Sequence, residues 1–222
     1  MSTQRFPGES PEYRKARDEL LQAELALKRQ VEKVAEQRRD LPEGGEVAED
    51  YEFAASDGTT IRLSELFADG QDTLVLYNFM YGPEMENACP MCTSFLDGLN
   101  GNAPHIIRRV SLAVVAKNPI GKIQDYADGR GWGELRMLSS AGNTFNRDYS
   151  GEDASGNQNT MMHVFAKRGG RVRHFWSSEL NAAQTDPGQD ARHIDMMWPL
   201  WNVLDITPDG RGKDWYPERS YS

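Results

Sequence analysis

The chain has 222 residues, 38% of them hydrophobic, which allows one substantial core with room for an extension. Acidic residues outnumber basic ones by 34 to 25, giving a net charge of −9. No dense basic cluster is evident beyond the N-terminal region, so binding to nucleic acid or to an anionic membrane is disfavoured.

The N-terminal stretch is polar, and no segment is long and apolar enough to cross a membrane. We therefore expect neither a signal peptide nor a transmembrane helix, and we expect a cytoplasmic protein. In a reducing compartment, a lone Cys-x-x-Cys is more often catalytic or metal-binding than a structural disulfide.

Residues 10–39 contain no glycine and no proline after Pro11, and their apolar residues recur at spacings of three and four. This pattern predicts a long amphipathic helix, ended by a linker at Leu41–Gly45. Its narrow apolar seam suits packing on the body of the protein or on a second copy in a homodimer. We expect three parts: helix and linker (1–45), a main domain (46–206), and an aromatic tail (207–222) packed on the domain or on a partner.

In the first half of the main domain, the sequence predicts a β-hairpin around Ser56-Asp57-Gly58 and then a buried strand at 73–80. A helix should start beside the cysteines and continue towards Val110, either kinked near Pro104 or split there. A second continuous apolar strand follows at 111–116. Because a helix separates the strands at 73–80 and 111–116, we expect these two strands to form a parallel pair joined by a crossover helix.

In the second half of the main domain, the sequence predicts a helix at 119–129 and a short strand at 135–138. A hairpin follows, with strands at 161–166 and 171–176 around Gly169-Gly170. A final amphipathic helix is predicted at 191–204, and the tail beyond it carries Trp215 and Tyr216.

The sequence Cys89-Pro90-Met91-Cys92 contains the only two cysteines of the chain, between the predicted strand and helix. Pro90 suits the first position of a helix, which makes Cys89 the N-cap. The sulfur of Cys89 then faces unpaired amides and the positive end of the helix, which favours the thiolate. Cys92 lies one turn further on, on the apolar stripe. One activated and one sheltered thiol are what thiol–disulfide exchange requires.

Several neighbours of the cysteines are candidates for lining the site. Glu84 and Glu86 lie in the loop before Cys89 and suit proton transfer or, as we favour, simple solvation. Tyr77 and Asn78 end the buried strand and are placed either to hydrogen-bond near Cys92 or to pack in the core. Trp132, in a glycine-flanked loop, suits a wall of the site or, as we favour, the core.

Taken in order, these elements resemble a thioredoxin-like fold of the peroxiredoxin-related kind: an α/β domain with a mixed sheet flanked by helices, here with a long N-terminal helical extension. Several stretches look like those of a bacterial family known as predicted dithiol–disulfide oxidoreductases, a domain of otherwise unknown function. They are Arg38–Pro42, Tyr77–Met80, Cys89–Cys92, Gly131-Trp132, Ser139-Ser140, Phe145-Asn146, Leu204–Pro208 and Gly210–Gly212.

The chain also departs from better-known relatives with this fold. Thioredoxins place Gly-Pro between their cysteines, where this chain has Pro90-Met91, and they keep a cis-proline at the place of Asn159-Thr160. The buried carboxylate of thioredoxins would fall near Tyr77-Asn78. Peroxiredoxins carry Thr or Ser where this chain has Glu86. Because Asn159-Thr160 takes the place of the cis-proline, which lies opposite the active site of thioredoxins, we include Thr160 among the site-lining residues.

The resulting hypothesis is a thiol–disulfide oxidoreductase in which Cys89 attacks and Cys92 resolves the mixed disulfide, with no cofactor and no metal. Its partners would be a protein or small-molecule disulfide or thiol as substrate, and a recycling thiol or reductase. One alternative is a thiol peroxidase. Another is a non-catalytic binding module or metal-binding protein, although no His-x3–5-His pair accompanies the cysteines.

Overall fold

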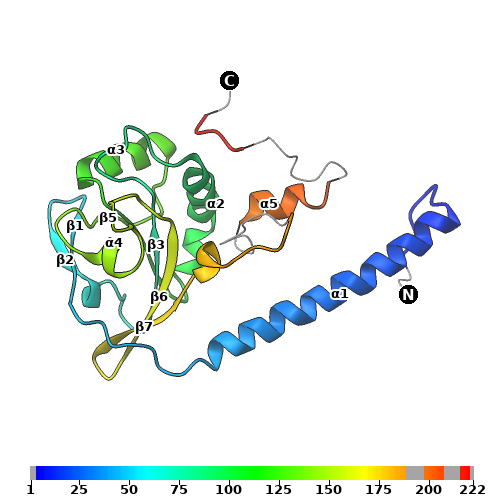
Figure 1. Cartoon of the computed structure of the whole chain (residues 1–222), viewed down its shortest axis with the longest axis horizontal. Helices are drawn as coiled ribbons and strands as arrows, with labels where there is room; N and C mark the ends of the chain where they lie inside the picture. Colours follow the sequence, from blue (N-terminus) through cyan, green and yellow to red (C-terminus); the bar gives the residue numbers. More distant parts are fainter. Residues whose placement is uncertain (1–3, 189–197, 208–215, 221–222) are drawn as a thin grey trace. The chain divides into compact units, whose positions relative to one another are not determined.

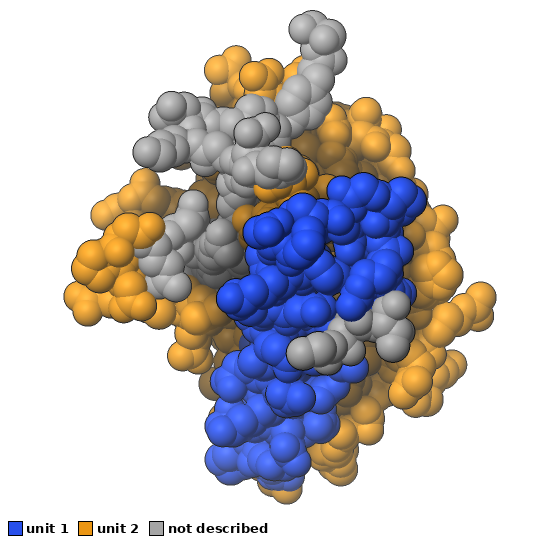
Figure 2. Space-filling view, turned by 90° about the vertical axis from the view of Figure 1, so that its right-hand side faces the viewer, with its two compact units in different colours: residues 1–43 blue, residues 44–222 orange. Residues whose placement is uncertain are grey.

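The computed structural model describes residues 4–188, 198–207 and 216–220 (Figure 1). By its contacts, the chain divides into two compact units, residues 1–43 and 44–222, which Figure 2 colours separately. In the described part of the chain, no helix combines the length and the apolar character that a membrane span needs.

The first unit consists mainly of α1 (Pro11–Arg39), which confirms the predicted helix. Ser10 caps its start, because the Ser10 hydroxyl accepts a hydrogen bond of 3.1 Å from the amide of Tyr13. Arg38 and Arg39 lie in the last turn, where positive charge complements the helix dipole. The helix therefore has favourable residues at both ends.

The second unit is built on one sheet of seven strands, in the order β2-β1-β5-β4-β3-β6-β7. The three central strands β3, β4 and β5 run parallel, and the outer strands pair antiparallel. The strands are β1 (Glu52–Ala55), β2 (Thr60–Arg62), β3 (Thr73–Asn78), β4 (Ser111–Ala116), β5 (Met137–Ser139), β6 (Met161–Arg168) and β7 (Arg171–Ser177).

Helices lie on both faces of this sheet, as Figure 1 shows. They are α2 (Pro90–Ile106), α3 (Ile120–Arg130) and α4 (Phe145–Asp148), whereas α5 (Pro199–Leu204) packs against α2. Short 3-10 turns lie at Leu63–Glu65 and Glu179–Ala182. Residues of β3 alternate between two hydrophobic clusters, with Tyr77 on the side of α2 and Leu76 on the side of α4. Because both faces are covered, the central strands are mostly apolar, with polar residues only at their ends.

The order of strands and helices, with a parallel strand–helix–strand core followed by an antiparallel hairpin, defines a thioredoxin-like α/β domain. The predicted fold class is therefore confirmed. The strand before the cysteines ends at Asn78 rather than Met80. The helix after them is single and runs through Pro104 to Ile106. The final helix is described from Pro199 onwards, and the rest of its predicted range lies outside the described residues, as does Trp215.

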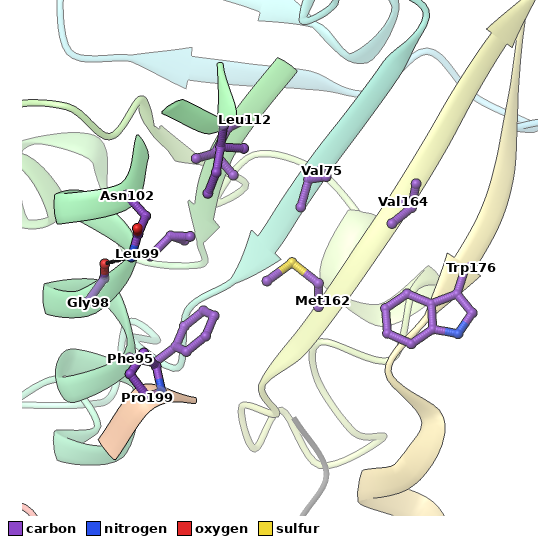
Figure 3. A pocket seen from close by; sticks show the side chains of 11 residues that line it. Val75, Phe95, Gly98, Leu99, Asn102, Leu112, Met162, Val164, Trp176 and Pro199 are labelled. Atoms are coloured by element: carbon purple, nitrogen blue, oxygen red, sulfur yellow. Dashed lines mark hydrogen bonds between the residues drawn. The ribbon is translucent and has the colours of Figure 1, made fainter. Parts of the chain in front are cut away.

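An apolar pocket of about 440 Å³ lies between α2 and the sheet (Figure 3). The residues that line it are Val75, Phe95, Gly98, Leu99, Asn102, Ile106, Leu112, Met162, Val164, Trp176 and Pro199. Neither cysteine is among them, and neither is any ionisable side chain. We therefore seek the chemistry of this protein at the cysteines rather than in this pocket.

Phe145 is central to the cluster on the α4 face. Its side chain is fully buried, and its ring centroid lies 5.3 Å from that of Phe53 and 4.9 Å from that of Tyr149. We expect Phe145→Ala to lower the free energy of unfolding by about 3–5 kcal/mol, measured by urea denaturation. The control Leu180→Ala removes a side chain that is 55% exposed and should change it by less than about 0.5 kcal/mol. Equal losses in the two variants would contradict this view of the core.

Candidate active site

Cys89 is held at the start of α2, just beyond the end of β3. It is the N-cap of the helix, and Pro90 takes the first helical position, as the sequence predicts. The amide of Cys89 donates to the carbonyl of Met80 at 3.1 Å, and its carbonyl accepts from the amide of Thr93 at 3.0 Å. These two bonds tie the cysteine both to the end of the sheet and to the first turn of the helix.

The sulfur of Cys89 lies in surroundings that favour its thiolate. The thiol of Cys92 donates a hydrogen bond to it, and the amides of Cys92 and Met91 donate two more. The positive charge of Arg219 acts in the same direction. Together these contacts outweigh the opposing effect of partial burial and lower the pKa of Cys89 to about 6.

Cys92 has the opposite character. Its side chain is 1% exposed, and this burial is the main reason that its pKa lies well above the ordinary value for a thiol. The negative charge on Cys89 raises it further. Hydrogen bonds from the Tyr77 hydroxyl and the Met80 amide act the other way, but they are weaker. The pair therefore consists of one thiolate and one protonated thiol.

Tyr77 lies in the core beside Cys92, fully buried. Its hydroxyl is hydrogen-bonded to the sulfur of Cys92 and accepts a bond of 2.7 Å from the hydroxyl of Thr160. Burial, together with the negative charge of the cysteines, raises the pKa of Tyr77 well above its usual value, so it stays a neutral phenol. The structure thus brings Tyr77 and Thr160 together behind the buried thiol, and none of the described carboxylates contributes to the shifted pKa of Cys92.

Asn78, the next residue of β3, points to the other side of the sheet and positions a loop. Its side-chain amide donates to the carbonyls of Asn159 at 2.6 Å and Gly151 at 3.3 Å. A Cβ atom on Gly151 would approach the Asn78 side chain to 2.7 Å, so glycine is needed for this close packing. Asn78 therefore holds the loop that ends at Thr160, rather than contacting a sulfur.

The two predicted acids lie on the surface. Glu84 and Glu86 are both exposed, in the loop between β3 and α2. The loop is fixed at Gly82, whose carbonyl accepts a bond of 2.9 Å from the side chain of Asn118. The glutamates therefore surround the site with negative charge, and neither forms a hydrogen bond with the cysteines among the contacts of the described residues.

Trp132 packs into the core rather than beside the cysteines. It is 3% exposed, and its indole N–H donates to the carboxylate of Asp97 at 2.8 Å. Its ring lies 5.8 Å from that of Phe79 and 5.7 Å from that of Tyr126. This placement joins the loop after α3 to α2 and fits the core role that the sequence favours.

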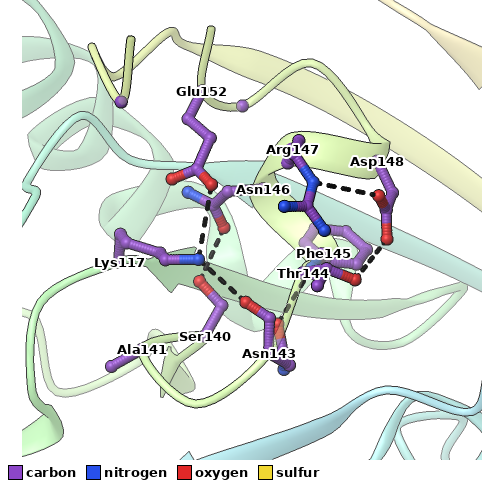
Figure 4. A network of polar contacts seen from close by, with 12 residues as sticks. Lys117, Ser140, Ala141, Asn143, Thr144, Phe145, Asn146, Arg147, Asp148 and Glu152 are labelled. Atoms are coloured by element: carbon purple, nitrogen blue, oxygen red, sulfur yellow. Dashed lines mark hydrogen bonds and ion pairs between the residues drawn. The ribbon is translucent and has the colours of Figure 1, made fainter. Parts of the chain in front are cut away.

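A polar network fixes the loops beyond β4 and β5 (Figure 4). Lys117 donates to the carbonyl of Asn143 at 2.8 Å and pairs with Glu152 at 3.5 Å. The hydroxyl of Ser140 donates to Asn146 at 2.6 Å. Asn146 in turn donates to Gln158 at 3.2 Å. Since Gln158 packs against Gly82, the network supports the loop that precedes Cys89.

The described tail residues also reach the cysteines, which the sequence did not reveal. Arg219 donates from Nη1 to the carbonyl of Ala88 at 3.3 Å. Burial and the negative charge of both cysteines raise the pKa of Tyr216 to about 12. No spacing or periodicity connects residues so far apart in sequence. The only available signal was the aromatic composition of the tail.

Among the described residues, no group of three or more His, Cys, Asp or Glu side chains is placed to hold a metal ion. His163 is a core residue, and its Nδ1 lies 2.7 Å from the hydroxyl of Ser177. Burial lowers the pKa of His163 to about 3, so its ring is neutral.

A family model described as "Bacterial protein of unknown function (DUF899)" matches residues 3–221, so the chain belongs to this family. A search of curated proteins gives no match. Peroxidoxin BcpB from Mycobacterium tuberculosis is 19% identical, with 74% of this chain and 98% of that chain covered and a TM-score of 0.46. A PrxQ mutant from Xylella fastidiosa is 12% identical, with 62% and 84% covered and a TM-score of 0.47.

A third solved structure is the exposed lipoprotein thioredoxin Etrx1 from Streptococcus pneumoniae. It is 17% identical, with 57% of this chain and 87% of that chain covered and a TM-score of 0.41. These proteins are similar to the chain in fold. The activity therefore has to be argued from the chain's own site.

The unequal thiols lead to a direct prediction. Because the thiolate is the reactive form, alkylation of Cys89 by iodoacetamide should have its midpoint near pH 6, against about 8.5 for a free cysteine. Cys92 should remain unmodified in the folded protein. In Cys92→Ala the midpoint should move upwards, since the strongest contact that favours the thiolate is lost. Peptide mapping by mass spectrometry measures both, and a midpoint at or above the free value would contradict the activated thiolate.

Proposed function

We propose that this protein is a thiol–disulfide oxidoreductase, with Cys89 as the nucleophile and Cys92 as the resolving thiol. One observation carries the proposal: two hydrogen-bonded cysteines at the start of α2 have pKa values shifted in opposite directions. The half-buried Cys89 is ionised at neutral pH and can attack, while the fully buried Cys92 stays protonated until the second step.

In the first step, the Cys89 thiolate attacks one sulfur of a substrate disulfide. A bond forms between the two sulfurs, the substrate S–S bond breaks, and one substrate thiolate leaves. In the second step, Cys92 loses its proton and attacks the sulfur of Cys89, which releases the second substrate sulfur. Of the two sulfurs released, one takes up this proton and leaves as a thiol, and the other leaves as a thiolate. Two electrons pass from the dithiol to the substrate, and the protein is left as the Cys89–Cys92 disulfide.

The surroundings of Cys92 suit this order of events. While Cys89 is an anion, its charge raises the pKa of Cys92. Once Cys89 is bound in a mixed disulfide, that charge is gone, and Cys92 becomes easier to deprotonate. The Tyr77 hydroxyl then stabilises the new thiolate by a hydrogen bond, and Thr160 fixes the Tyr77 oxygen. Tyr77 would thus perform, as a neutral donor, the task of a buried acid.

The cycle needs a partner that returns the protein to the dithiol form. A dithiol, or a reductase that supplies one, restores the couple by the reverse exchange, and no cofactor is required. We place this chemistry in the cytoplasm, where thiols are kept reduced. The substrate is a disulfide or thiol of a protein or of a small molecule.

Trapping the mixed disulfide tests the proposal. In Cys92→Ser the second step is blocked, so incubation with a small disulfide should leave one substrate thiol attached to Cys89, as seen by intact mass. Cys89→Ser should gain no such adduct in the same time. Dithiothreitol should remove the adduct. If neither variant forms an adduct, or if Cys89→Ser forms one as fast, Cys89 is not the nucleophile.

The same proteins separate this activity from the peroxidase alternative. The reduced wild type is mixed with hydrogen peroxide or with a disulfide, and the loss of free thiol is followed by stopped flow. We expect peroxide to react no faster than it does with a free cysteine at equal thiolate concentration. A peroxide rate far above that of the disulfide would replace the proposed function with a thiol peroxidase.

The role given to Tyr77 predicts a selective defect. A hydrogen bond to a charged group contributes about 1.5–3 kcal/mol, so Tyr77→Phe should slow release of the second thiol by about ten- to a hundredfold. Release of the first thiol should change little. The control is Tyr126→Phe, because the Tyr126 hydroxyl bonds to Thr93 at 2.8 Å rather than to a cysteine. Single-turnover thiol release measures both steps, and equal slowing of both would contradict the role.

A further inference from the structure

The described tail residues 216–220 form part of the surface beside Cys89. Pro217 is buried, and Arg219 reaches Ala88, the residue that precedes Cys89. The charge of Arg219 acts on the Cys89 sulfur, and the negative charges of both cysteines act on Tyr216. Any molecule that approaches the half-buried sulfur of Cys89 therefore comes close to the Arg219 side chain.

The backbone of Arg219 is fixed by the helices that carry the site. Arg130 of α3 donates a hydrogen bond to the carbonyl of Arg219. Arg130 is held by Asp97 of α2, with Nε and Oδ1 3.2 Å apart and a second contact between Nη2 and Oδ2. Asp97 also accepts the indole N–H of Trp132. The position of Arg219 is therefore set by contacts to α3 and to the residue before Cys89, not by the tail alone.

The guanidinium of Arg219 has unused capacity to bind. It is exposed, and among the described residues its one hydrogen-bond acceptor is the carbonyl of Ala88. A guanidinium has five N–H donors in a planar array that matches a carboxylate. Arg130, the cation next to it, is already paired with Asp97, while Glu84 and Glu86 are exposed on the loop before Cys89 and the chain carries a net charge of −9. Arg219 is thus a local positive group in a negative field.

We propose that Arg219 is a specificity-determining residue, and that it selects disulfides that carry a carboxylate a few bonds from the sulfur. The carboxylate pairs with the guanidinium while the substrate sulfur meets Cys89, and the exchange then follows the two steps given above. This inference rests on the proposed function and adds to it the chemical class of the substrate. Without Arg219, the acidic surface would disfavour such anions.

Three small disulfides of different charge test the proposal: 3,3′-dithiodipropionate, bis(2-hydroxyethyl) disulfide and cystamine, which are anionic, neutral and cationic. Each is mixed with reduced full-length protein at about pH 8, where Cys89 is almost fully ionised in every variant. The rate of the first thiol release is divided by the rate of the same disulfide with a free neutral thiol. This ratio removes the intrinsic reactivity of each disulfide.

We expect the wild type to favour the anionic disulfide over the neutral one, and the neutral one over cystamine. Arg219→Gln should lower the anionic rate, relative to the neutral rate, by about five- to tenfold. Arg219→Lys should retain part of the preference, because lysine keeps the positive charge but lacks the planar array of N–H donors. The control Arg171→Gln removes an equal charge from the start of β7, where the arginine pairs with Glu46, and should leave the preference unchanged.

Added salt gives a second measurement that needs no variant. It should slow the anionic disulfide more than the neutral one in the wild type. The proposal is overturned if Arg219→Gln slows all three disulfides equally, if it changes none, or if salt affects the anionic and neutral disulfides alike. A wild type that reduces none of the three overturns the proposed function itself, whereas normal reduction without charge preference overturns only the role of Arg219.

Discussion

The hydrogen bond from the thiol of Cys92 to the sulfur of Cys89 is the interaction on which the rest of the site depends. It is the largest single cause of the depressed pKa of Cys89, and the same contact raises the pKa of Cys92. Two amides at the start of α2 add to it. Because these contacts favour the anion, they stabilise the dithiol form of the pair.

This arrangement needs a rigid frame, and the fold supplies one. β3 pairs in parallel with β4 and antiparallel with β6, so the strand that leads to the cysteines is central in the sheet. Its end is tied to Cys89 through the carbonyl of Met80, and the loop between them is held by Asn118. Thr160 lies at the end of the loop that Asn78 fixes, and its hydroxyl donates a hydrogen bond to the hydroxyl of Tyr77 on β3. The buried thiol is therefore enclosed by groups that lie on the central strands or next to them.

The site combines two kinds of electrostatic control. Behind Cys92 there is a neutral phenol in a dry environment, which offers a hydrogen bond without adding a charge that burial would penalise. In front of Cys89 there is a solvent-facing arginine, which gives charge where water can still stabilise it. In the proposed exchange, polarity at the buried thiol would serve the second step, and the positive charge beside Cys89 would serve the approach of the substrate.

The sequence determined the frame of this protein and the place of its cysteines. Periodicity and turn residues predicted the helix of the first unit, the buried strands and both hairpins, because these patterns are local. Pro90 and the cysteine spacing predicted the N-cap, since a helix start depends on a few adjacent residues.

Tyr77 and Thr160 were named as candidates, but the bond between their hydroxyls joins residues far apart in the chain, and no local pattern encodes it. Arg219 was missed for the same reason: its place beside Cys89 is set by contacts with Arg130 and Ala88 that only the folded chain creates. Residue type and spacing decide where a nucleophile can form, whereas its partners and its ionisation depend on which distant side chains the packed sheet and helices bring to the sulfur.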